Sequence, residues 1–539
     1  MSFFNKTVSE FSRPASPSFG NQAVLDRFFY CFVLCWFIYW SILPLIALDN
    51  EFIDALENIV WGSHFQFGYD KNPYLGAWLG HGAWIVTGKS LWINSFLCQG
   101  FVLLGLCSVY ALAKKILSPA LALISVLSLA AINFYGIKSV EFCDDVMELG
   151  LWPLVILFFY RALTKGNRFR DWTAVGAFLA FSFMTKYYAL VIAIPMLFIL
   201  LFTEKGRAAW KSPAIYVAIV LGVLISLPNL IWLFRNDMVA VNYALGRAAI
   251  SSGKSVSWTR HLTNPYSALR RALGVVVIPF VFLLALVFPR PVSPGNLSEQ
   301  ERFDRFFLYS FALGPLGITL LFSLCSGASI NYSWVVPCFP LLPLLVIFLL
   351  RPMVNEARLR YFLSCMIGMG LLFGVIFVIR SVYWQAYSKS GCDYENYPGK
   401  MLSAKITADW HSRYGTRLPF VIGDREATCN IAVYSPDHPE AYFSANRNFS
   451  QWIDEAEIAR KGAVLLWENH ESHRPQFLKR FSGPEWNTTP TVTIQVPRAT
   501  PAWFRKLIGR APKMFTASYC FIQPSGNHGG ERNKTGKRP

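Results

Sequence analysis

The chain has 539 residues, of which 54% are hydrophobic and 15% are charged. This composition is too apolar for a soluble protein of this length and predicts an integral membrane protein. The net charge of +18 does not point to nucleic-acid binding, because the Lys and Arg residues lie between apolar runs, where they orient membrane spans.

The N-terminal residues 1–27 show no small-residue cleavage site before the first apolar run, so we expect a cytoplasmic tail followed by an uncleaved span. A bilayer core needs about 20 apolar residues per helix. On this basis the sequence predicts a multi-span α-helical membrane domain over residues 28–380 with about eleven spans. The spans are expected near 28–48, 92–113, 118–136, 146–163, 172–185, 187–203, 214–235, 272–289, 306–325, 334–350 and 361–380, and 172–203 is also compatible with one long helix.

Clusters of Lys and Arg recur on one side of these spans, the side of the N-terminus. They are Lys114 and Lys115, Arg161 to Arg170, Lys205 to Lys211, Arg290 to Arg305, and Arg351 to Arg360. The positive-inside rule makes this the cytoplasmic side. The first loop, the turn at 138–145, the loop at 235–271 and everything after residue 380 are then expected on the outer face of the membrane.

The last part of the chain changes character. From Ser381 onward Gly, Pro and charged residues become frequent, which predicts a small α/β domain on the outer face over 381–525 and a disordered basic tail over 526–539. The expected strands are 419–422, 431–434, 462–467 and 491–496, and the expected helices are 401–414 and 449–460. Cys392, Cys429 and Cys520 lack metal-ligand spacing, and one disulfide or free thiols both fit.

The first outer loop, 48–84, is rich in charge and in aromatic residues, a composition typical of interfacial helices. Its charged residues are Asp49, Glu51, Asp54, Glu57, Asp70 and Lys71. Asp54 and Glu57 would share one face of a helix. A carboxylate beside the membrane could act as a general base, and a solvated acidic face is the alternative. Lys71 follows Tyr69 and Asp70, and a lysine presented on such a turn suits a phosphate.

Two further positions repeat this acid-and-lysine composition. In the turn at 138–145, Lys138 precedes Asp144 and Asp145, which could instead be the acidic first turn of the next span. Lys186, followed by Tyr187, stands between two apolar runs. A cation at a break between two helices could meet an anion, and the alternative is a lysine that snorkels to the interface.

The loop at 235–271 is basic although it is expected outside, which points to an anionic ligand. Its basic residues are Arg235, Arg247, Lys254, Arg260, His261, Arg270 and Arg271.

Carboxylates and lysines on one membrane face suit sugar transfer from a polyprenyl-phosphate donor. The phosphate is then a leaving group whose charge Lys or Arg would stabilise, and a carboxylate would deprotonate the acceptor.

The same residues carry a family resemblance. The chain resembles the glycosyltransferase-C superfamily of membrane enzymes, in the bacterial branch related to protein O-mannosyltransferases, which includes aminoarabinose and galacturonic acid transferases acting on lipid A and core lipopolysaccharide. The resembling residues are Asp54-x-x-Glu57-x-x-x-Trp61-Gly62, Gly68-Tyr69-Asp70-Lys71-Asn72-Pro73, Trp78, Trp152-Pro153, Trp172-x-x-x-Gly176, Thr185-Lys186-Tyr187, Pro228-Asn229-x-x-Trp232 and Tyr332-Ser333-Trp334-x-x-Pro337.

The resemblance implies an inverting transfer from a polyprenyl-phosphate-linked sugar to a lipid or glycan acceptor at a periplasmic active site. It assigns acid/base work to Asp54, with Glu57 next, and to Asp144 or Asp145, and phosphate contact to Lys71 and Lys186. The family's double proline is replaced by Asn-Pro-Tyr, and the first acidic pair is Asp-x-Glu at 49–51. Asp49, Glu51 and Asp54 therefore all stay open as the base.

No metal site or cofactor is predicted from the residues themselves. Some relatives use a divalent metal near the first loop, for which His64 and His81 are the candidates, although an interfacial histidine is the commoner role. Two other functions are alternatives. One is a lipid-linked sugar transporter or flippase, which predicts inverted repeats and charges near mid-membrane, and the other is a non-catalytic sugar sensor. The sugar, the acceptor and the oligomeric state do not follow from the sequence.

Overall fold

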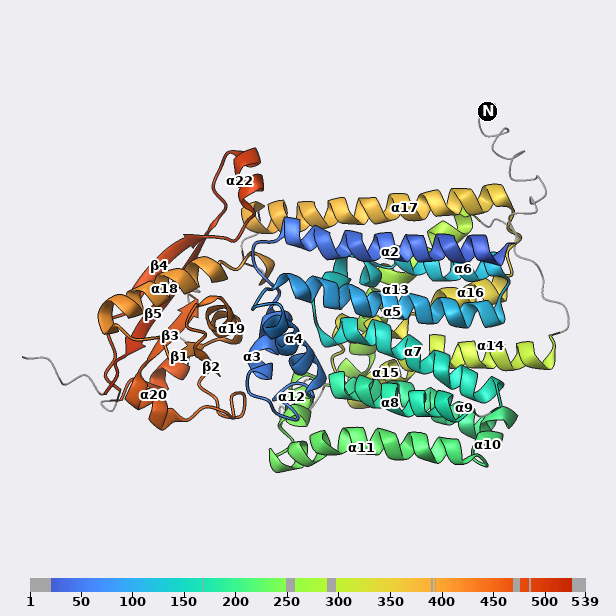
Figure 1. The fold of residues 1–539 in the computed structure, drawn as a ribbon, viewed down its shortest axis with the longest axis horizontal. Coiled ribbons are helices and arrows are strands. Elements are labelled where there is room, and N and C mark those ends of the chain that lie inside the picture. The colour runs from blue at the N-terminus through green and yellow to red at the C-terminus, as the bar shows by residue number, and fades with distance from the viewer. Residues whose placement is uncertain are drawn as a thin grey trace, which may run out of the picture. The chain divides into compact units, whose positions relative to one another are not determined.

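The computed structural model describes residues 21–166, 168–248, 257–287, 297–388, 391–392, 394–468, 476–483 and 486–525. The chain divides into two compact units, whose elements are labelled in Figure 1. A helical unit contains Met1–Leu45, Phe67–Gly76 and Trp92–Phe377, and an α/β unit contains Ile46–Gln66, Ala77–Leu91 and Val378–Pro539. The loop after the first span is thus shared between them. The predicted tail at 526–539 and most of that at 1–27 lie outside the described residues.

The helical unit consists of helices joined by short 3-10 turns. Its elements are α2 (Gln22–Ala47), α5 (Trp92–Ile116), α6 (Pro119–Leu127), η2 (Ser128–Ala131), η3 (Asn133–Tyr135), η4 (Ile137–Val140), α7 (Asp144–Thr164), α8 (Phe169–Thr185), η5 (Tyr187–Ala189), α9 (Leu190–Phe202), α10 (Glu204–Ala209), α11 (Pro213–Arg235), α12 (Val239–Arg247), α13 (Arg260–Val287), α14 (Glu299–Ala312), α15 (Gly314–Ser326), η6 (Tyr332–Cys338), α16 (Leu342–Leu350) and α17 (Glu356–Val378). Each of the eleven predicted apolar segments coincides with one helix or with a broken pair.

Fewer helices than the eleven predicted spans have the length and composition needed to cross a membrane. Among the described residues five helices are long and apolar enough to cross a membrane, α2, α5, α7, α11 and α17 with its extension, and seven if each of two bent pairs counts as one span. The pairs bend by 86° between η2 and η3 and by 44° between α14 and α15. In the described part of the chain, length and composition therefore define five to seven spans, fewer than the eleven predicted, and α8, α9 and α16 are each shorter than a full span.

Glycines allow the central helices of this unit to pack closely. In Figure 1, α5 lies beside α7, α7 beside α8 and α8 beside α11. A Cβ on Gly105 of α5 would lie 2.1 Å from the Leu149 carbonyl of α7, and one on Gly176 of α8 would lie 2.2 Å from the Ala218 carbonyl of α11. Small residues at such crossings are typical of membrane helices, where backbones approach closely.

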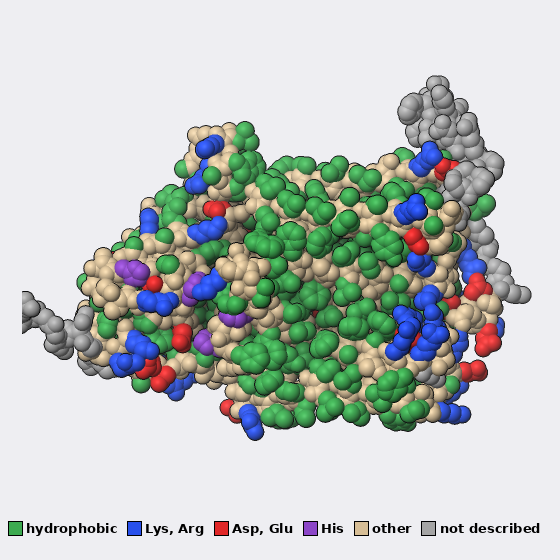
Figure 2. Space-filling model, viewed as in Figure 1, with side chains coloured by type: hydrophobic (Ala, Val, Ile, Leu, Met, Phe, Trp, Pro, Cys, Tyr) green, Lys and Arg blue, Asp and Glu red, His purple; other side chains and the backbone are tan. Residues whose placement is uncertain are grey.

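The outer surface of the helical unit is apolar. Figure 2 shows hydrophobic side chains over the middle of its helices. Leu34 of α2, Val223 of α11 and Leu371 of α17 are 55%, 53% and 57% exposed. Basic residues stand in the last turns of α5 and α7. Apolar side chains this exposed on long helices have lipid as their natural surroundings, so the protein is a membrane protein.

The α/β unit contains a five-stranded mixed sheet of order β2-β1-β3-β5-β4, in which β2, β1 and β3 are parallel and β5 is antiparallel to β3 and β4. The strands are β1 (Phe420–Gly423), β2 (Glu440–Phe443), β3 (Ala463–Glu468), β4 (Val492–Pro497) and β5 (Met514–Ile522). The helical elements are α3 (Ile53–Gly62), η7 (Ile379–Ser388), η8 (Tyr394–Asn396), α18 (Gly399–Tyr414), α19 (Arg425–Tyr434), α20 (Glu455–Lys461), α21 (Phe477–Arg480) and α22 (Ala502–Ile508), together with most of α4 (Leu75–Val86).

The expected small α/β domain is confirmed, with two local corrections. Strands were correctly placed near 419–422, 462–467 and 491–496, and a helix near 401–414. The strand expected at 431–434 is wrong, because these residues end α19. A short buried apolar run does not distinguish a strand from a helix by pattern alone. The helix expected over 449–460 is shorter than predicted and begins only at Glu455, as α20.

The first-loop helices pack within the α/β unit. α3 and α18 both pack on α19. A Cβ on Gly62 would lie 2.3 Å from the Ala77 carbonyl, so α3 and α4 meet backbone to backbone. The Trp78 indole donates to the Gln66 carbonyl at 2.9 Å. The residues predicted as interfacial helices are therefore helical, and their packing is with the C-terminal part of the chain.

Candidate active site

In the helical unit, a tight turn follows the first-loop helix α3. Gly68 and Pro73 form an antiparallel bridge at its base. The Asn229 side chain of α11 donates to the Phe67 carbonyl at 2.7 Å. A Cβ on Gly68 would lie 2.4 Å from the Trp232 ring of the same helix. Asn229 and Trp232 stand three residues apart, on one face of α11, so this face fixes the turn.

This turn presents polar residues to the start of α7. The Asn72 side chain donates to Asp144 Oδ2 at 2.7 Å, and both residues are buried. Asp70 is also buried, and Lys71 between them is partly exposed. Asp144 lies in the first turn of α7, where the helix dipole favours a negative charge. The predicted lysine of the first loop and an acid of the second turn thus belong to one polar cluster.

Lys186 joins the same end of α7. It stands between the end of α8 and the start of η5 with extended backbone, as predicted from the two flanking apolar runs. Its ammonium forms an ion pair with Asp145, and the two side chains are 15% and 16% exposed. A largely buried lysine needs such a partner to remain charged. Figure 1 shows α7 and α8, the helices that position this pair, side by side.

The sequence interpretation missed Glu148. It lies four residues after Asp144, on the same face of α7, and is fully buried. The hydroxyl groups of Ser182 and Thr185 at the end of α8 donate to its carboxyl group. Glu148 therefore connects α7 to the helix end that carries Lys186. The four-residue spacing inside an apolar span was the signal that could have identified it.

The first-loop carboxylates other than Asp70 lie in the α/β unit, and Glu57 is the most enclosed of these four. It is 1% exposed and forms an ion pair with Arg425 of α19. The guanidinium lies 5.8, 4.7 and 5.5 Å from the ring centroids of Trp61, Phe443 and Phe449. These rings stabilise the cation and shield the pair from water. Glu57 is therefore engaged by Arg425 in an enclosed ion pair.

The other first-loop acids are more accessible. Asp49 forms an ion pair with Lys400 at 3.1 Å. The Glu51 amide donates to the Tyr434 hydroxyl at 2.9 Å, and burial raises the pKa of Tyr434. Asp54 lies in the first turn of α3 and is partly exposed.

Of the remaining predicted residues, Tyr69 is buried and Tyr187 packs edge-on to Phe183 with ring centroids 5.4 Å apart. Lys138 lies in η4 and is partly buried.

In the basic loop, Arg247 and Arg260 are exposed at the end of α12 and the start of α13. His261 Nδ1 lies 2.8 Å from the Leu324 carbonyl oxygen. Lys254 lies outside the described residues.

The histidines considered as metal ligands have other surroundings. His64 stacks on Trp452 at 4.5 Å between ring centroids, and burial, with a smaller effect of His81, lowers the pKa of His64 to about 4. His81 Nδ1 lies 3.0 Å from the Ile59 carbonyl oxygen, and burial lowers its pKa too. Within the described ranges, no three His, Cys, Asp or Glu side chains are grouped to hold a metal ion.

The fold and the polar cluster around Asp144, Asp145 and Lys186 define the class of the protein. It is a multi-span helical membrane protein with an ion pair and further acids at the ends of its helices. A family model described as dolichyl-phosphate-mannose-protein mannosyltransferase matches residues 71–232. The matched region includes Lys71, Asp144, Asp145, Lys186 and Asn229 of the cluster.

Two curated relatives come from Rhizobium johnstonii. The chain is 22% identical over 275 residues to the lipid A galacturonosyltransferase RgtD and 24% identical over 303 residues to the lipopolysaccharide core galacturonosyltransferase RgtB. These alignments cover 49% and 54% of this chain, and 55% and 59% of the two relatives, so the chain spans little more than half their length.

The fold is similar to that of ArnT from Cupriavidus metallidurans bound to undecaprenyl phosphate, with a TM-score of 0.56 and 13% identity over 91% of this chain and 97% of that one. The apo structure of the same protein matches with a TM-score of 0.50. Together these findings confirm the resemblance to the glycosyltransferase-C superfamily, and the chain has its membrane fold.

Proposed function

We propose that the protein is a membrane glycosyltransferase that transfers a sugar from a polyprenyl-phosphate-linked donor to a lipid or glycan acceptor of the bacterial cell envelope. The observation that carries this proposal is the cluster of Asp144, Asp145 and Lys186 beside the turn that bears Lys71. It lies within the region that matches the mannosyltransferase family model.

Lys186 and Lys71 are proposed to bind the donor phosphate. As the bond between the sugar and the phosphate breaks, negative charge develops on the departing phosphate, and an ammonium group in a partly dry site stabilises it. Before the donor binds, Asp145 neutralises Lys186. A phosphate would compete for the same ammonium, so donor binding would release the Asp145 carboxylate.

The acceptor hydroxyl needs a base, and the inverting mechanism has it attack the sugar carbon opposite the phosphate. We propose Asp54 for this role, because Glu57 is buried and engaged by Arg425 and Asp54 is partly exposed in the first turn of its helix. A positioned general base contributes about 10²–10⁴-fold to a rate. Asp144 then holds the turn that bears Lys71 through Asn72, and Asp145 holds Lys186 until the donor phosphate binds.

The acceptor class is proposed from the relatives. Their names assign them to lipid A and to the lipopolysaccharide core, so a lipopolysaccharide acceptor and an acidic sugar such as galacturonate come first. Lys114 and Lys115 end α5, and Arg161 lies in the last turn of α7. By the positive-inside rule these ends face the cytoplasm, which supports a periplasmic active site in the inner membrane.

The test is transfer by the purified protein in liposomes that contain polyprenyl-phosphate-linked galacturonic acid and lipid A, with the product measured by mass spectrometry. We expect transfer by the wild type and a loss of about 100-fold for Lys186→Ala. Lys211→Ala, at an exposed position before α11, is the matched control and should retain full activity. Movement of the lipid-linked sugar across the bilayer without any transfer would overturn the proposal in favour of a flippase.

A further inference from the structure

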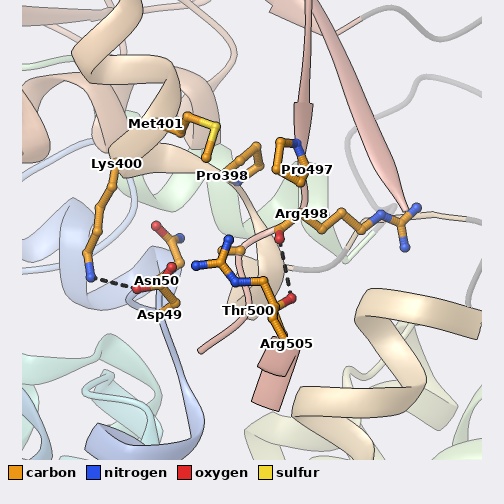
Figure 3. Close-up of a pocket in the computed structure, with 10 residues that line it drawn as sticks. Asp49, Asn50, Pro398, Lys400, Met401, Pro497, Arg498, Thr500 and Arg505 are labelled. Atoms are coloured by element: carbon orange, nitrogen blue, oxygen red, sulfur yellow. Dashed lines mark hydrogen bonds and ion pairs between the residues drawn. The ribbon is translucent and has the colours of Figure 1, made fainter. Parts of the chain in front are cut away.

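A cavity of about 270 Å³ lies within the α/β unit, and the proposed chemistry does not use it. It is formed by the residues that follow the first span, Asp49 and Asn50, by the start of α18, and by the segment that connects β4 to α22 (Figure 3). Lys400 contributes from α18, and Arg505 from α22.

The cavity carries an excess of positive charge. Lys400 and Asp49 neutralise each other in an ion pair of 3.1 Å. Figure 3 shows the Arg505 guanidinium turned toward Asn50, and Arg498 pointing away. The Arg498 guanidinium donates to the Gln385 carbonyl at 2.7 Å. In the part of the chain that the structure describes, Arg505 forms no ion pair, so its charge is available to a ligand.

Asn50 supplies an unused hydrogen-bond acceptor. It is 4% exposed, and its Nδ2 donates to the carbonyl groups of Glu51 and Tyr394, both at 3.1 Å. These two bonds fix the orientation of the amide. Its Oδ1 is buried and accepts no hydrogen bond from the described residues. Buried acceptors rarely remain unpaired, so a donor such as a hydroxyl group is expected in the cavity.

The start of α18 adds a second anion-binding feature. α18 has 16 residues and begins at Gly399, whose N–H donates to the Tyr397 carbonyl at 2.9 Å, so the backbone N–H groups of Lys400 and Met401 are those that lack partners inside the helix. Lys400 and Met401 of this turn line the cavity. The positive end of a helix dipole favours a phosphate or a carboxylate there.

We infer that this cavity binds an anionic sugar, one that carries a phosphate or a carboxylate group. Arg505 and the start of α18 hold the anionic group, and Asn50 Oδ1 accepts a hydrogen bond from a hydroxyl group of the ring. A neutral sugar leaves Arg505 uncompensated, and inorganic phosphate alone leaves much of the cavity unfilled. The inference deepens the proposed function and rests on it, because the anionic sugar would belong to the acceptor.

Binding to the full-length protein in lipid nanodiscs tests this site by calorimetric titration. The probes are glucose 1-phosphate, galacturonic acid, glucose and inorganic phosphate. We expect glucose 1-phosphate or galacturonic acid to bind at least about tenfold more tightly than glucose or inorganic phosphate. Which of the two binds more tightly distinguishes a phosphorylated from a carboxylated acceptor. Equal binding of inorganic phosphate and both anionic sugars would overturn the inference.

Two exposed residues of α22 provide the matched pair of variants. Arg505→Gln should weaken binding of the anionic sugar by about tenfold, the size expected for one charge-assisted contact. Lys506→Gln removes the same charge from the next position, which does not line the cavity, and should leave binding unchanged. Equal effects of the two substitutions would overturn the inference.

The transfer assay separates this inference from the proposed function. Arg505→Gln should raise the acceptor KM and leave kcat and donor binding unchanged. If Arg505→Gln transfers the sugar normally with an unaltered acceptor KM, the cavity does not bind the acceptor, and the proposed glycosyltransferase function still stands. A wild type that binds the anionic sugar through Arg505 and transfers nothing would reject the proposed function and retain the binding site.

Discussion

Two ion pairs, one in each unit, show how similar residues acquire different roles. In the α/β unit Glu57 is 1% exposed, and its partner Arg425 is 23% exposed and lies over three aromatic rings. In the helical unit Asp145 and Lys186 are 16% and 15% exposed, and the adjacent Asp144 accepts a hydrogen bond from Asn72.

The difference between the pairs lies in what surrounds the cation. Arg425 is enclosed by rings and a carboxylate, which stabilise it in place. Lys186 stands at a break between helices, beside a turn that bears a second lysine. A pair enclosed by aromatic side chains is expected to be structural. A pair among polar groups can exchange its carboxylate for a phosphate, so the helical unit is the better place for donor chemistry.

The largest expected effect concerns Asp54, the first-loop acid that we propose as the base. Asp54→Asn should lower transfer by about 100-fold or more, because the acceptor loses its base. The rate is measured in liposomes, and folding is checked by thermal unfolding. Glu457→Gln, at an acid paired with Arg460 on α20, is the control and should keep the rate of the wild type. Full activity in Asp54→Asn would assign the base elsewhere.

Glu57→Gln tests the enclosed pair through stability. The substitution leaves the Arg425 charge without its carboxylate in a largely dry site, and should cost about 2–3 kcal/mol, below the range for a fully buried pair because Arg425 is partly exposed. Thermal unfolding in detergent measures the shift. Glu457→Gln removes a carboxylate from an exposed pair on α20 and should not shift unfolding. Loss of transfer with wild-type stability would make Glu57 catalytic.

Much of this comparison could be predicted from the sequence, and the reasons are local. Lys186 was placed at a helix break because apolar runs flank it, and Asp144 and Asp145 were placed at the start of a span. Glu57 was a catalytic candidate, second to Asp54, because of the family resemblance, and that role stays a prediction. Its partner lies 368 residues further along the chain, and no local pattern reveals a contact at that distance.

The division of the first loop between the two units was not foreseeable either. Charge and aromatic content indicate an interface, and they do not distinguish packing on lipid from packing on another part of the chain. α3 packs on α19, which lies far along the chain from the first loop. The helical ending of α19 was missed for a related reason, since four apolar residues fit a strand as well as a helix.

A smaller effect is expected from Gly68→Ala in the turn beside Lys186. The added Cβ would lie 2.4 Å from the Trp232 ring and displace the turn that carries Lys71. We expect a raised KM for the donor and lower thermal stability. Gly82→Ala is the matched control, because a Cβ there meets no atom within 4 Å, and in a helix it should stabilise slightly. Identical donor KM values in both variants would show that the turn does not contribute to donor binding.

The smallest expected effect is a pH dependence in the α/β unit. The pKa of His64 is lowered to about 4 by burial, whereas in the unfolded chain the imidazole has its ordinary pKa of about 6.5. Protonation therefore favours the unfolded state as the pH falls from about 6.5 to 4, and stability declines over this window. His64→Gln should flatten the dependence of the unfolding midpoint between pH 7 and 4. An unchanged slope would place the titration on other groups.

The central claim is that Lys186 holds the donor phosphate. Its most direct test is the affinity of the purified protein for undecaprenyl phosphate in nanodiscs, measured for wild type, Lys186→Ala and Lys211→Ala. We predict that Lys186→Ala binds at least about tenfold more weakly, as expected for the loss of one charge-assisted contact, while Lys211→Ala binds like wild type. Equal affinity of all three proteins, with folding intact, would contradict the claim.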